Sequence, residues 1–200
     1  MNYLPKLKTK LKNGNEKLFL KNFKLQKEYK ILDFWKWAYS DILSNSIRGK
    51  FAEFIIATAL DIDLTKPSEE WNPYDLTTKE GIKIEIKTSA YIQSWGQKKL
   101  SKPIFSIRPT KYWDDKKGFQ TEIKRQSDFY IFCLLKETDQ EKINPLNLDQ
   151  WEFYILSTKK LNKEKQNQKT ISLNPLKKIA KNIPYNLLKS EFEKEVKNNF

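Results

Sequence analysis

The chain has 200 residues, of which 38% are apolar and 14% aromatic, enough for one domain with a substantial core. Its formal charge of +13 favours a polyanionic partner, most simply nucleic acid, although biased composition and a solvated surface would give the same excess. There is no histidine and only one cysteine, Cys133, which excludes serine–histidine triads, histidine-metal nucleases, cysteine zinc sites and intramolecular disulfides.

The N-terminal region has no targeting or membrane signal. No run approaches the ~20 apolar residues of a membrane span, and the first fourteen residues lack the apolar core of a signal peptide. We therefore expect a cytoplasmic protein with no membrane partner. Residues 1–27 are rich in lysine with scattered leucines, which leaves open an arm, a short hairpin or a docked segment.

Two helices are predicted next. Between residues 28 and 43, Leu32, Trp35 and Tyr39 recur at helical spacing, which predicts an amphipathic helix with its tryptophans in the core. A second helix is predicted from about residue 46 to residue 60, with Ser44, Asn45 or Ser46 as its N-cap.

The second predicted helix carries a single charge in its apolar part. Between residues 51 and 60 only Glu53 is charged. Burial of an unpaired carboxylate costs several kcal/mol, so Glu53 is expected to meet a cation, a metal ion or a hydrogen-bond donor. The alternative is that Glu53 faces water or pairs with Lys50.

A β-hairpin is predicted over residues 72–88. From residue 81 to residue 88, isoleucines alternate strictly with charged or polar side chains, which indicates a strand with one buried face. A three-residue loop ending at Gly81 suits the preceding turn and predicts a positive φ there. In this register Asp75 lies opposite Glu85, because a shift by one residue would mix the apolar and polar faces.

The middle of the chain supplies candidate nucleic-acid contacts. After the hairpin comes a basic loop in which Gln93, Lys98 and Lys99 are expected to contact a substrate backbone. Residues 104–108 predict a third strand. Residues 110–127 mix aromatic and charged side chains, which suits a surface loop that binds nucleic acid by stacking and phosphate contacts, or one whose aromatics shield a core edge.

The second half of the chain completes the predicted domain. Residues 129–135 are continuously apolar and predict a strand covered on both faces, with residues 151–156 as its neighbour. Residues 158–182 are polar, with a turn predicted at Asn174-Pro175, and a terminal helix is predicted from Pro184. We expect one domain with its core over about 28–157, an N-terminal arm over 1–27 and a C-terminal helical extension over 158–200.

The order of acidic residues resembles a known nuclease motif. Glu53 on a helix, Asp75 on one strand and Glu85-Ile86-Lys87 on the next resemble the PD-(D/E)XK superfamily, with Pro73-Tyr74-Asp75 at the proline–aspartate position and one residue inserted. The likeness is best over residues 46–108. A group of small bacterial proteins of this superfamily is also similar to this chain in three segments, RGKFAEF, IEIKTSAYIQSW and WEFYIL. It implies an α/β restriction-endonuclease-like core, a central mixed β-sheet flanked by helices, and magnesium-dependent hydrolysis of DNA phosphodiesters.

Taken with this resemblance, the residue types imply a Mg²⁺ site, in which Mn²⁺ is expected to substitute. Asp75 and Glu85 supply hard oxygen ligands together with the Ile86 carbonyl, and Glu53 is expected to complete the shell or bind a second ion. Lys87 is expected to orient or deprotonate the attacking water and to stabilise the transition state. The alternative is a salt-bridge cluster in a nucleic-acid-binding module without catalysis.

The expected partner is double-stranded DNA, and a homodimer is left open. Restriction or antiviral defence is favoured over junction resolution or repair, because no helicase, nucleotide-binding or zinc motif accompanies the core. The only arginines, Arg48, Arg108 and Arg125, are the first candidates for phosphate or base contacts, since a guanidinium binds bidentately where an ammonium does not.

Overall fold

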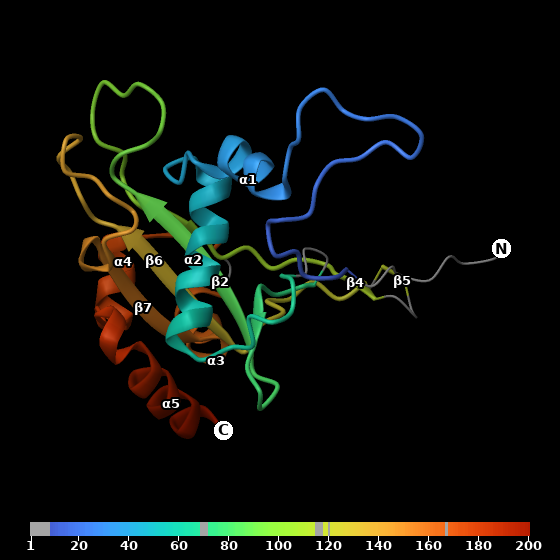
Figure 1. The fold of residues 1–200 in the computed structure, drawn as a ribbon. Helices are drawn as coiled ribbons and strands as arrows, with labels where there is room; N and C mark the ends of the chain where they lie inside the picture. Colours follow the sequence, from blue (N-terminus) through green and yellow to red (C-terminus); the bar gives the residue numbers. More distant parts are fainter. Residues whose placement is uncertain (1–8, 69–71, 115–117, 120, 167) are drawn as a thin grey trace.

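A four-stranded sheet lies at the centre of the computed structural model, which describes residues 9–68, 72–114, 118–119, 121–166 and 168–200 (Figure 1). In spatial order its strands are β1 (Leu76–Thr77), β2 (Lys83–Ala90), β6 (Phe129–Leu135) and β7 (Trp151–Ser157). β2 and β6 run parallel, whereas the β1–β2 and β6–β7 pairs are antiparallel. The expected α/β fold with a mixed sheet flanked by helices is confirmed.

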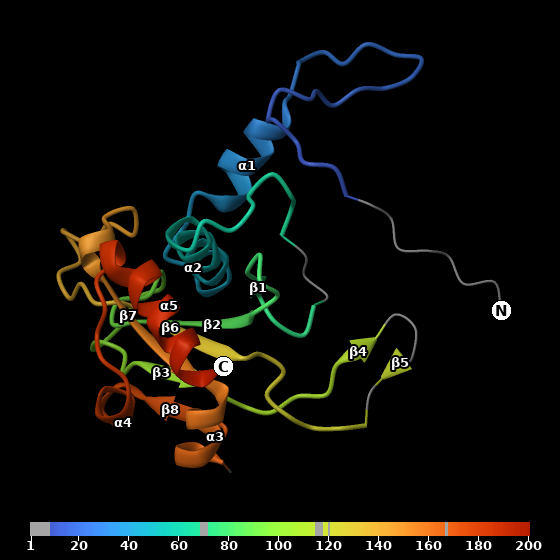
Figure 2. The same ribbon diagram turned by 90° about the horizontal axis from the view of Figure 1, so that it is seen from below.

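Two helices cover one face of the sheet, α2 (Asn45–Ala59) and α5 (Leu188–Asn199) (Figure 2). Alternate residues of β2 and β6, including Ile84 and Phe129, pack there against Ala52 of α2. The ring of Phe192 from α5 meets the ring of Phe129 edge-on, with centroids 5.2 Å apart. The predicted terminal helix is present, but it begins later than expected, because Pro184 is extended and a short 3-10 turn, η2 (Tyr185–Leu187), precedes α5.

The opposite face of the sheet is covered by an antiparallel pair and two short helices (Figure 2). They are β3 (Ile104–Ser106), β8 (Thr170–Ser172), α3 (Thr158–Lys165) and α4 (Leu173–Ile179). A second buried cluster forms between these elements and the other side chains of β6 and β7. All seven residues of β6 are buried, so the prediction of a strand covered on both faces is confirmed.

The hairpin that joins β1 to β2 has the predicted register. Leu76 pairs with Ile84 and Thr77 pairs with Lys83. The N–H of Gly81 donates to the carbonyl of Thr78 at 3.0 Å, and Gly81 has a φ of +84°. The three-residue loop and the positive φ are therefore confirmed.

The structure corrects the prediction for the first helix. α1 spans only Ile31–Tyr39 and contains no buried residue, and Trp37 is 84% exposed. The prediction that both tryptophans belong to the core was therefore wrong, since Trp37 is exposed and Trp35 is only partly buried. Before α1, the chain forms an arm whose ends pair, because Ile31 donates its N–H to the carbonyl of Glu16 at 2.9 Å and Lys17 bridges to Lys30 (Figure 1).

Residues 158–182 also differ from the prediction. The segment forms α3, β8 and α4, and Asn174-Pro175 lies in the first turn of α4, where proline is tolerated because its missing N–H has no intrahelical partner. A few widely spaced apolar side chains, such as Leu161, Ile171 and Leu176, secure this layer against the sheet. The predicted third strand, β3, is shorter than expected and pairs with β8 rather than with the central sheet.

The remaining described elements are small. β4 (Trp113–Asp114) pairs with β5 (Gly118–Phe119) within the predicted binding loop, and η1 (Leu148–Gln150) precedes β7. Parts of that loop, residues 115–117 and 120, lie outside the described residues. Within the described part of the chain, no helix has the length and apolar character required to cross a bilayer.

Candidate active site

The hairpin register brings Asp75 to the strand that carries Glu85. The N–H of Asp75 donates to the carbonyl of Ile84 at 3.0 Å, and Oδ2 of Asp75 accepts from the N–H of Ile86 at 2.6 Å. The Asp75 carboxylate is thus held against the backbone of β2 between Glu85 and Lys87. This arrangement follows from the alternation that buries Ile84 and Ile86 and leaves the intervening charges on the other face.

Glu85 and Lys87 lie two residues apart on the same face of β2 and form an ion pair. Their side chains are 19% and 28% exposed, so the pair is shielded from water more than a surface pair is. Such shielding makes an ion pair sensitive to its geometry, because neither charge is fully solvated when the partner is removed.

Glu53 approaches the same region from α2. Its Oε2 lies 2.6 Å from Nζ of Lys50, which also donates to Oγ of Ser68 at 3.0 Å. The Glu53 side chain is only 16% exposed. The structure therefore contains the Lys50 pairing that the sequence offered as an alternative, and it also places Glu53 close enough to Asp75 for their charges to interact.

Burial and repulsion between the carboxylates raise the pKa values of Glu53 and Glu85. The pKa of Glu53 is raised, first by burial and further by the charge of Asp75, against the opposing hydrogen bond from Lys50. The pKa of Glu85 is raised by burial and then by Asp75, against the opposing charge of Lys87. The site thus holds more negative charge than its own lysines neutralise, a condition that an added cation would relieve.

The donor atoms suit Mg²⁺ in kind, because carboxylate and carbonyl oxygens are its preferred protein ligands. They are not gathered around one point, since within the described residues no group of three or more acidic or cysteine side chains is arranged to hold a metal ion. The carboxylates of Glu53 and Glu85 are engaged by Lys50 and Lys87 instead. Metal binding would therefore require these side chains to exchange their lysine contacts for the ion.

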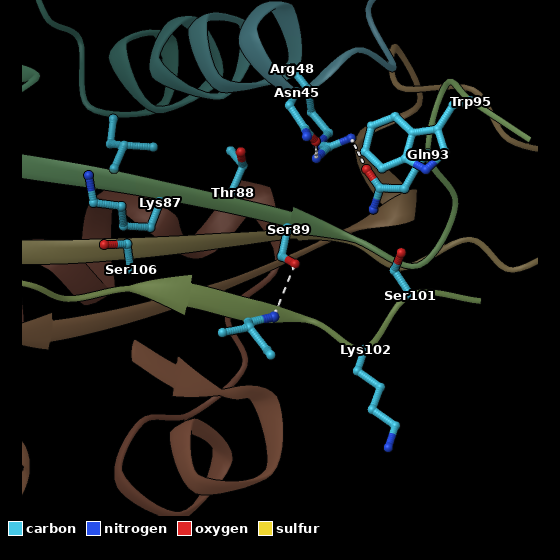
Figure 3. Close-up of a pocket in the computed structure, with 12 residues that line it drawn as sticks. Asn45, Arg48, Lys87, Thr88, Ser89, Gln93, Trp95, Ser101, Lys102 and Ser106 are labelled. Carbon is cyan, nitrogen blue, oxygen red and sulfur yellow. Dashed lines mark hydrogen bonds between the residues drawn. The ribbon is translucent and has the colours of Figure 1, made fainter. Parts of the chain in front are cut away.

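Two pockets adjoin the cluster on different sides. Glu53 and Asp75 line a pocket of about 970 Å³, the Asp75 pocket, whereas Glu85 is not among its lining residues. Ile86 and Lys87 line a second one of about 510 Å³. We call this second one the Trp95 pocket; its other lining residues are Asn45, Arg48, Thr88, Ser89, Gln93, Trp95, Ser101, Lys102, Ile104 and Ser106 (Figure 3).

A family model described as bacteriophage T4 endonuclease IV matches residues 4–175. The chain belongs to this endonuclease family. A comparison with individual curated proteins gives no match.

The match to the T4 endonuclease IV family confirms the expectation of a nuclease. It includes the arm, α1, α2, the whole central sheet and the β3–β8 pair, and it ends within the first turn of α4. Glu53, Asp75, Glu85 and Lys87 all lie inside the matched range. α5, which packs on the helical face of the sheet, lies beyond it.

The residues predicted to contact nucleic acid differ in how exposed they are in this member of the T4 endonuclease IV family. Lys98, Lys99 and Arg108 are exposed, as a contact with substrate requires. Arg48 is only 3% exposed and borders the Trp95 pocket together with Gln93. Its guanidinium donates from Nη1 to the carbonyl of Leu43 at 2.7 Å.

Arg125 has a different environment from the other arginines. It is 6% exposed, and its guanidinium donates to the carbonyls of Ile107, Lys165 and Gln168 and to Oδ1 of Asn162, at 2.5 to 3.1 Å. These bonds tie the segment after β3 to α3 and the turn that follows it. The structure therefore gives Arg125 a role in holding this layer together.

The sequence reasoning missed several residues beside the site. Trp95 and Asn45 line the Trp95 pocket, and Lys50 neutralises Glu53. The available signal for Trp95 was a lone aromatic residue beside a glycine in an otherwise polar loop. The sequence around Asn45 predicts only an N-cap for the second helix and gives no indication of a pocket residue.

Proposed function

We propose that the chain is a Mg²⁺-dependent endonuclease with a PD-(D/E)XK active site on a restriction-endonuclease-like core, and that it hydrolyses phosphodiester bonds in DNA. The observation that carries this proposal is the hairpin register that sets Asp75 opposite Glu85, with Lys87 beside Glu85 on the same strand face. Membership of the endonuclease family supports the reaction class, and the charge of +13 supports a polyanionic substrate.

The chemistry follows from what each residue can do. Asp75, Glu85 and the Ile86 carbonyl would hold the ion, with Glu53 as a further ligand. A bound Mg²⁺ polarises a phosphate oxygen and lowers the pKa of a bound water. Lys87 remains beside the ion ligands as a fixed positive charge, where it can orient the attacking water and stabilise the charge that develops on the phosphoryl oxygens.

Two lysines compensate for part of the buried negative charge, since Lys87 neutralises Glu85 and Lys50 neutralises Glu53. A metal ion held by Glu85 would supply the positive charge that Lys87 provides in this pair. The Lys87 ammonium, in the same place, would then be available to a substrate phosphate.

A second candidate function is nucleic-acid binding without catalysis. The observation in its favour is that the carboxylates of Glu53 and Glu85 are already paired with lysines, and that among the described residues no three acidic or cysteine side chains are arranged around a metal position. The predicted double-stranded substrate, the homodimer and the role in restriction or antiviral defence remain predictions.

The decisive experiment is a cleavage assay with the purified full-length chain. Supercoiled plasmid, linear duplex, single-stranded DNA and RNA are incubated with Mg²⁺, with Mn²⁺ and with a chelator. We expect metal-dependent cleavage of DNA, and a loss of roughly 10²- to 10⁴-fold in Lys87→Ala. Lys83→Ala is a matched control, because Lys83 lies on the same strand but its ammonium sits over the Tyr74 ring, 5.5 Å from the centroid.

Two results would reject the enzyme in favour of the binding module. One is the absence of metal-dependent cleavage of every nucleic acid tried, with binding retained. The other is wild-type cleavage by Lys87→Ala.

A further inference from the structure

The Trp95 pocket shares no lining residue with the Asp75 pocket, and no function has been assigned to it above. Figure 3 shows Lys87 at one end of the pocket, with Arg48, Asn45, Gln93 and Trp95 grouped at the other end. Its volume of about 510 Å³ falls in the range of pockets that enclose small organic ligands, roughly 300–1,000 Å³. The pocket can therefore accept a group of the size of a nucleotide.

Trp95 stands at this end on a loop that is braced from within. Oε1 of Gln97 accepts from the N–H of Gln93 at 2.8 Å, and its Nε2 donates to Oγ of Ser101 at 2.9 Å and to the carbonyl of Tyr91 at 3.3 Å. The N–H of Ser101 closes the loop on the carbonyl of Tyr91 at 2.8 Å. A loop with these bonds holds its tryptophan in place before any ligand arrives.

Trp95 itself is 53% exposed in spite of this bracing. Leaving a large aromatic face in water costs free energy that burial would recover. An exposed indole on a braced loop beside a pocket is the arrangement that proteins use to stack the flat face of a nucleobase.

The floor of the same end is a buried polar group. Arg48 is 3% exposed, and its Nη2 donates to Oδ1 of Asn45 at 2.5 Å while Nη1 donates to Oε1 of Gln93 at 3.3 Å. The Nε of Arg48 is buried with no hydrogen-bond partner among the described groups. That Nε atom is too deeply buried for a ligand to reach. Nη2 carries two hydrogens and, among the described groups, donates only to Asn45, so its second hydrogen is available to an acceptor on a bound ligand.

The charges of the pocket match those of a nucleotide. None of the described residues that line it is acidic, whereas Arg48, Lys87 and Lys102 are basic. A nucleotide whose phosphate lies at the Lys87 end would place its base toward Trp95, because the two groups line one continuous pocket.

We propose that the Trp95 pocket binds one nucleobase of the substrate, next to the phosphate that is cleaved. Trp95 stacks on the base, and Arg48, fixed by Asn45 and Gln93, faces the base edge. This inference rests on the proposed function, because Lys87 is the residue that relates the pocket to the scissile phosphate. It makes the pocket the place where the enzyme distinguishes nucleotides, since the edge of a base held there can be read by hydrogen bonds.

The test measures binding separately from cleavage. The Glu85→Gln variant serves as a non-cleaving background, in buffer without divalent metal. Two labelled single strands of about 12 nucleotides are compared by fluorescence anisotropy, one of deoxythymidine and one of the same length without any base. Trp95→Ala and Trp95→Phe are introduced into this background, and Trp37→Ala is the matched control for loss of an exposed tryptophan outside the pocket.

We expect Trp95→Ala to weaken binding of the base-containing strand roughly 5- to 150-fold, the loss that corresponds to one base–aromatic stack, and to leave the abasic strand unaffected. Trp95→Phe should retain most of the affinity, and Trp37→Ala should not change the ratio between the two strands. An equal loss on both strands would mean that the pocket contacts only the backbone, and no loss would mean that it is not used; either result overturns the proposal.

Failure of the base-binding role can be distinguished from failure of the proposed nuclease function. If the wild-type chain cleaves DNA and Trp95→Ala leaves base dependence unchanged, the base-binding role falls and the nuclease stands. If no metal-dependent cleavage is found but Trp95→Ala abolishes the difference between the strands, the pocket binds a base in a module that does not cut.

Discussion

The backbone N–H of Ile86 donates a 2.6 Å hydrogen bond to Oδ2 of Asp75. This bond ties the first strand of the hairpin to the second at the position where Glu85 and Lys87 flank the carboxylate. A slip of one residue in the hairpin would break it and would turn the charged side chains of β2 toward the apolar core. The geometry of the candidate active site therefore depends on the short turn at residues 79–81 that sets the register.

The turn can be tested through Gly81. Its φ is +84°, and a Cβ added there would meet nothing within 4 Å, so the cost of Gly81→Ala is backbone strain alone, about 1–2 kcal/mol. Gly49 in α2 also has open space, and Gly49→Ala should stabilise by about 0.5–1 kcal/mol because the helix interior favours alanine. Urea unfolding measures both. If Gly81→Ala stabilised the fold as much as Gly49→Ala does, the hairpin would not depend on a positive φ at Gly81.

Glu85 should make stability depend on pH. Its pKa is raised in the folded state by burial and by Asp75, so the stability it contributes is present below the ordinary value of 4.5 and is lost as pH rises through the raised pKa. Glu85→Gln should therefore raise the melting temperature at pH 8, and the gain should disappear below pH 4.5. The exposed Glu193 provides the matched substitution, Glu193→Gln. A loss of stability at pH 8 would show that the Lys87 ion pair outweighs burial.

Substitution of Lys87 and substitution of Asp75 should have different effects, the first on cleavage alone and the second on both metal binding and cleavage. Mg²⁺ at about 100 times its dissociation constant should stabilise the wild-type chain and Lys87→Ala by about 2.7 kcal/mol, since only the folded state binds the ion. Asp75→Asn should lose this stabilisation as well as cleavage, because it removes a ligand charge. Thermal unfolding with and without Mg²⁺, beside a nicking assay, measures the two defects. Loss of metal stabilisation in Lys87→Ala would make that lysine part of the metal site rather than of the reaction.

Arg125 and the loop lysines should separate stability from substrate affinity. Arg125→Lys should lower the free energy of unfolding by about 1–3 kcal/mol, because a single ammonium cannot satisfy four acceptors on three segments. The salt dependence of DNA binding should remain as in the wild type. Lys98→Ala and Lys99→Ala should each reduce the log–log salt slope by up to about 0.9 if the lysine neutralises one phosphate. A reduced salt slope in Arg125→Lys would show instead that Arg125 contacts the nucleic acid.

The hairpin and the buried strands could be predicted because their signals are local. The alternation around Ile84 fixes which side of β2 is buried, and the all-apolar run of β6 shows that both its faces are covered. The register then follows, and with it the neighbourhood of Asp75 and Glu85. The lone charge of Glu53 in an apolar helix also identified a residue that the structure brings near them.

The layer under the sheet and the Trp95 pocket could not be predicted because they depend on contacts between distant segments. β8 is a strand because Ile171 pairs opposite Phe105 and is buried there, not because three residues favour that conformation. Asn45 and Gln93 are adjacent only after α2 has packed on β2. The prediction for α1 was wrong for the opposite reason, since none of its periodic apolar residues is buried and two of them, Leu32 and Tyr39, remain exposed.

The parallel pairing of β2 with β6 sets the order in which the chain can acquire its structure. Ile84 pairs with Phe129, so the long intervening segment must be brought back before the centre of the sheet exists. A parallel pair cannot be closed by a hairpin, and the entropy of closure is lost before the contacts compensate for it. Folding is therefore expected in the range of roughly milliseconds to seconds, with α2 and the β1–β2 hairpin forming first. Until then the edge of β6 that pairs with β2 is open, and because β6 is apolar on both faces it is the segment through which refolding chains should aggregate.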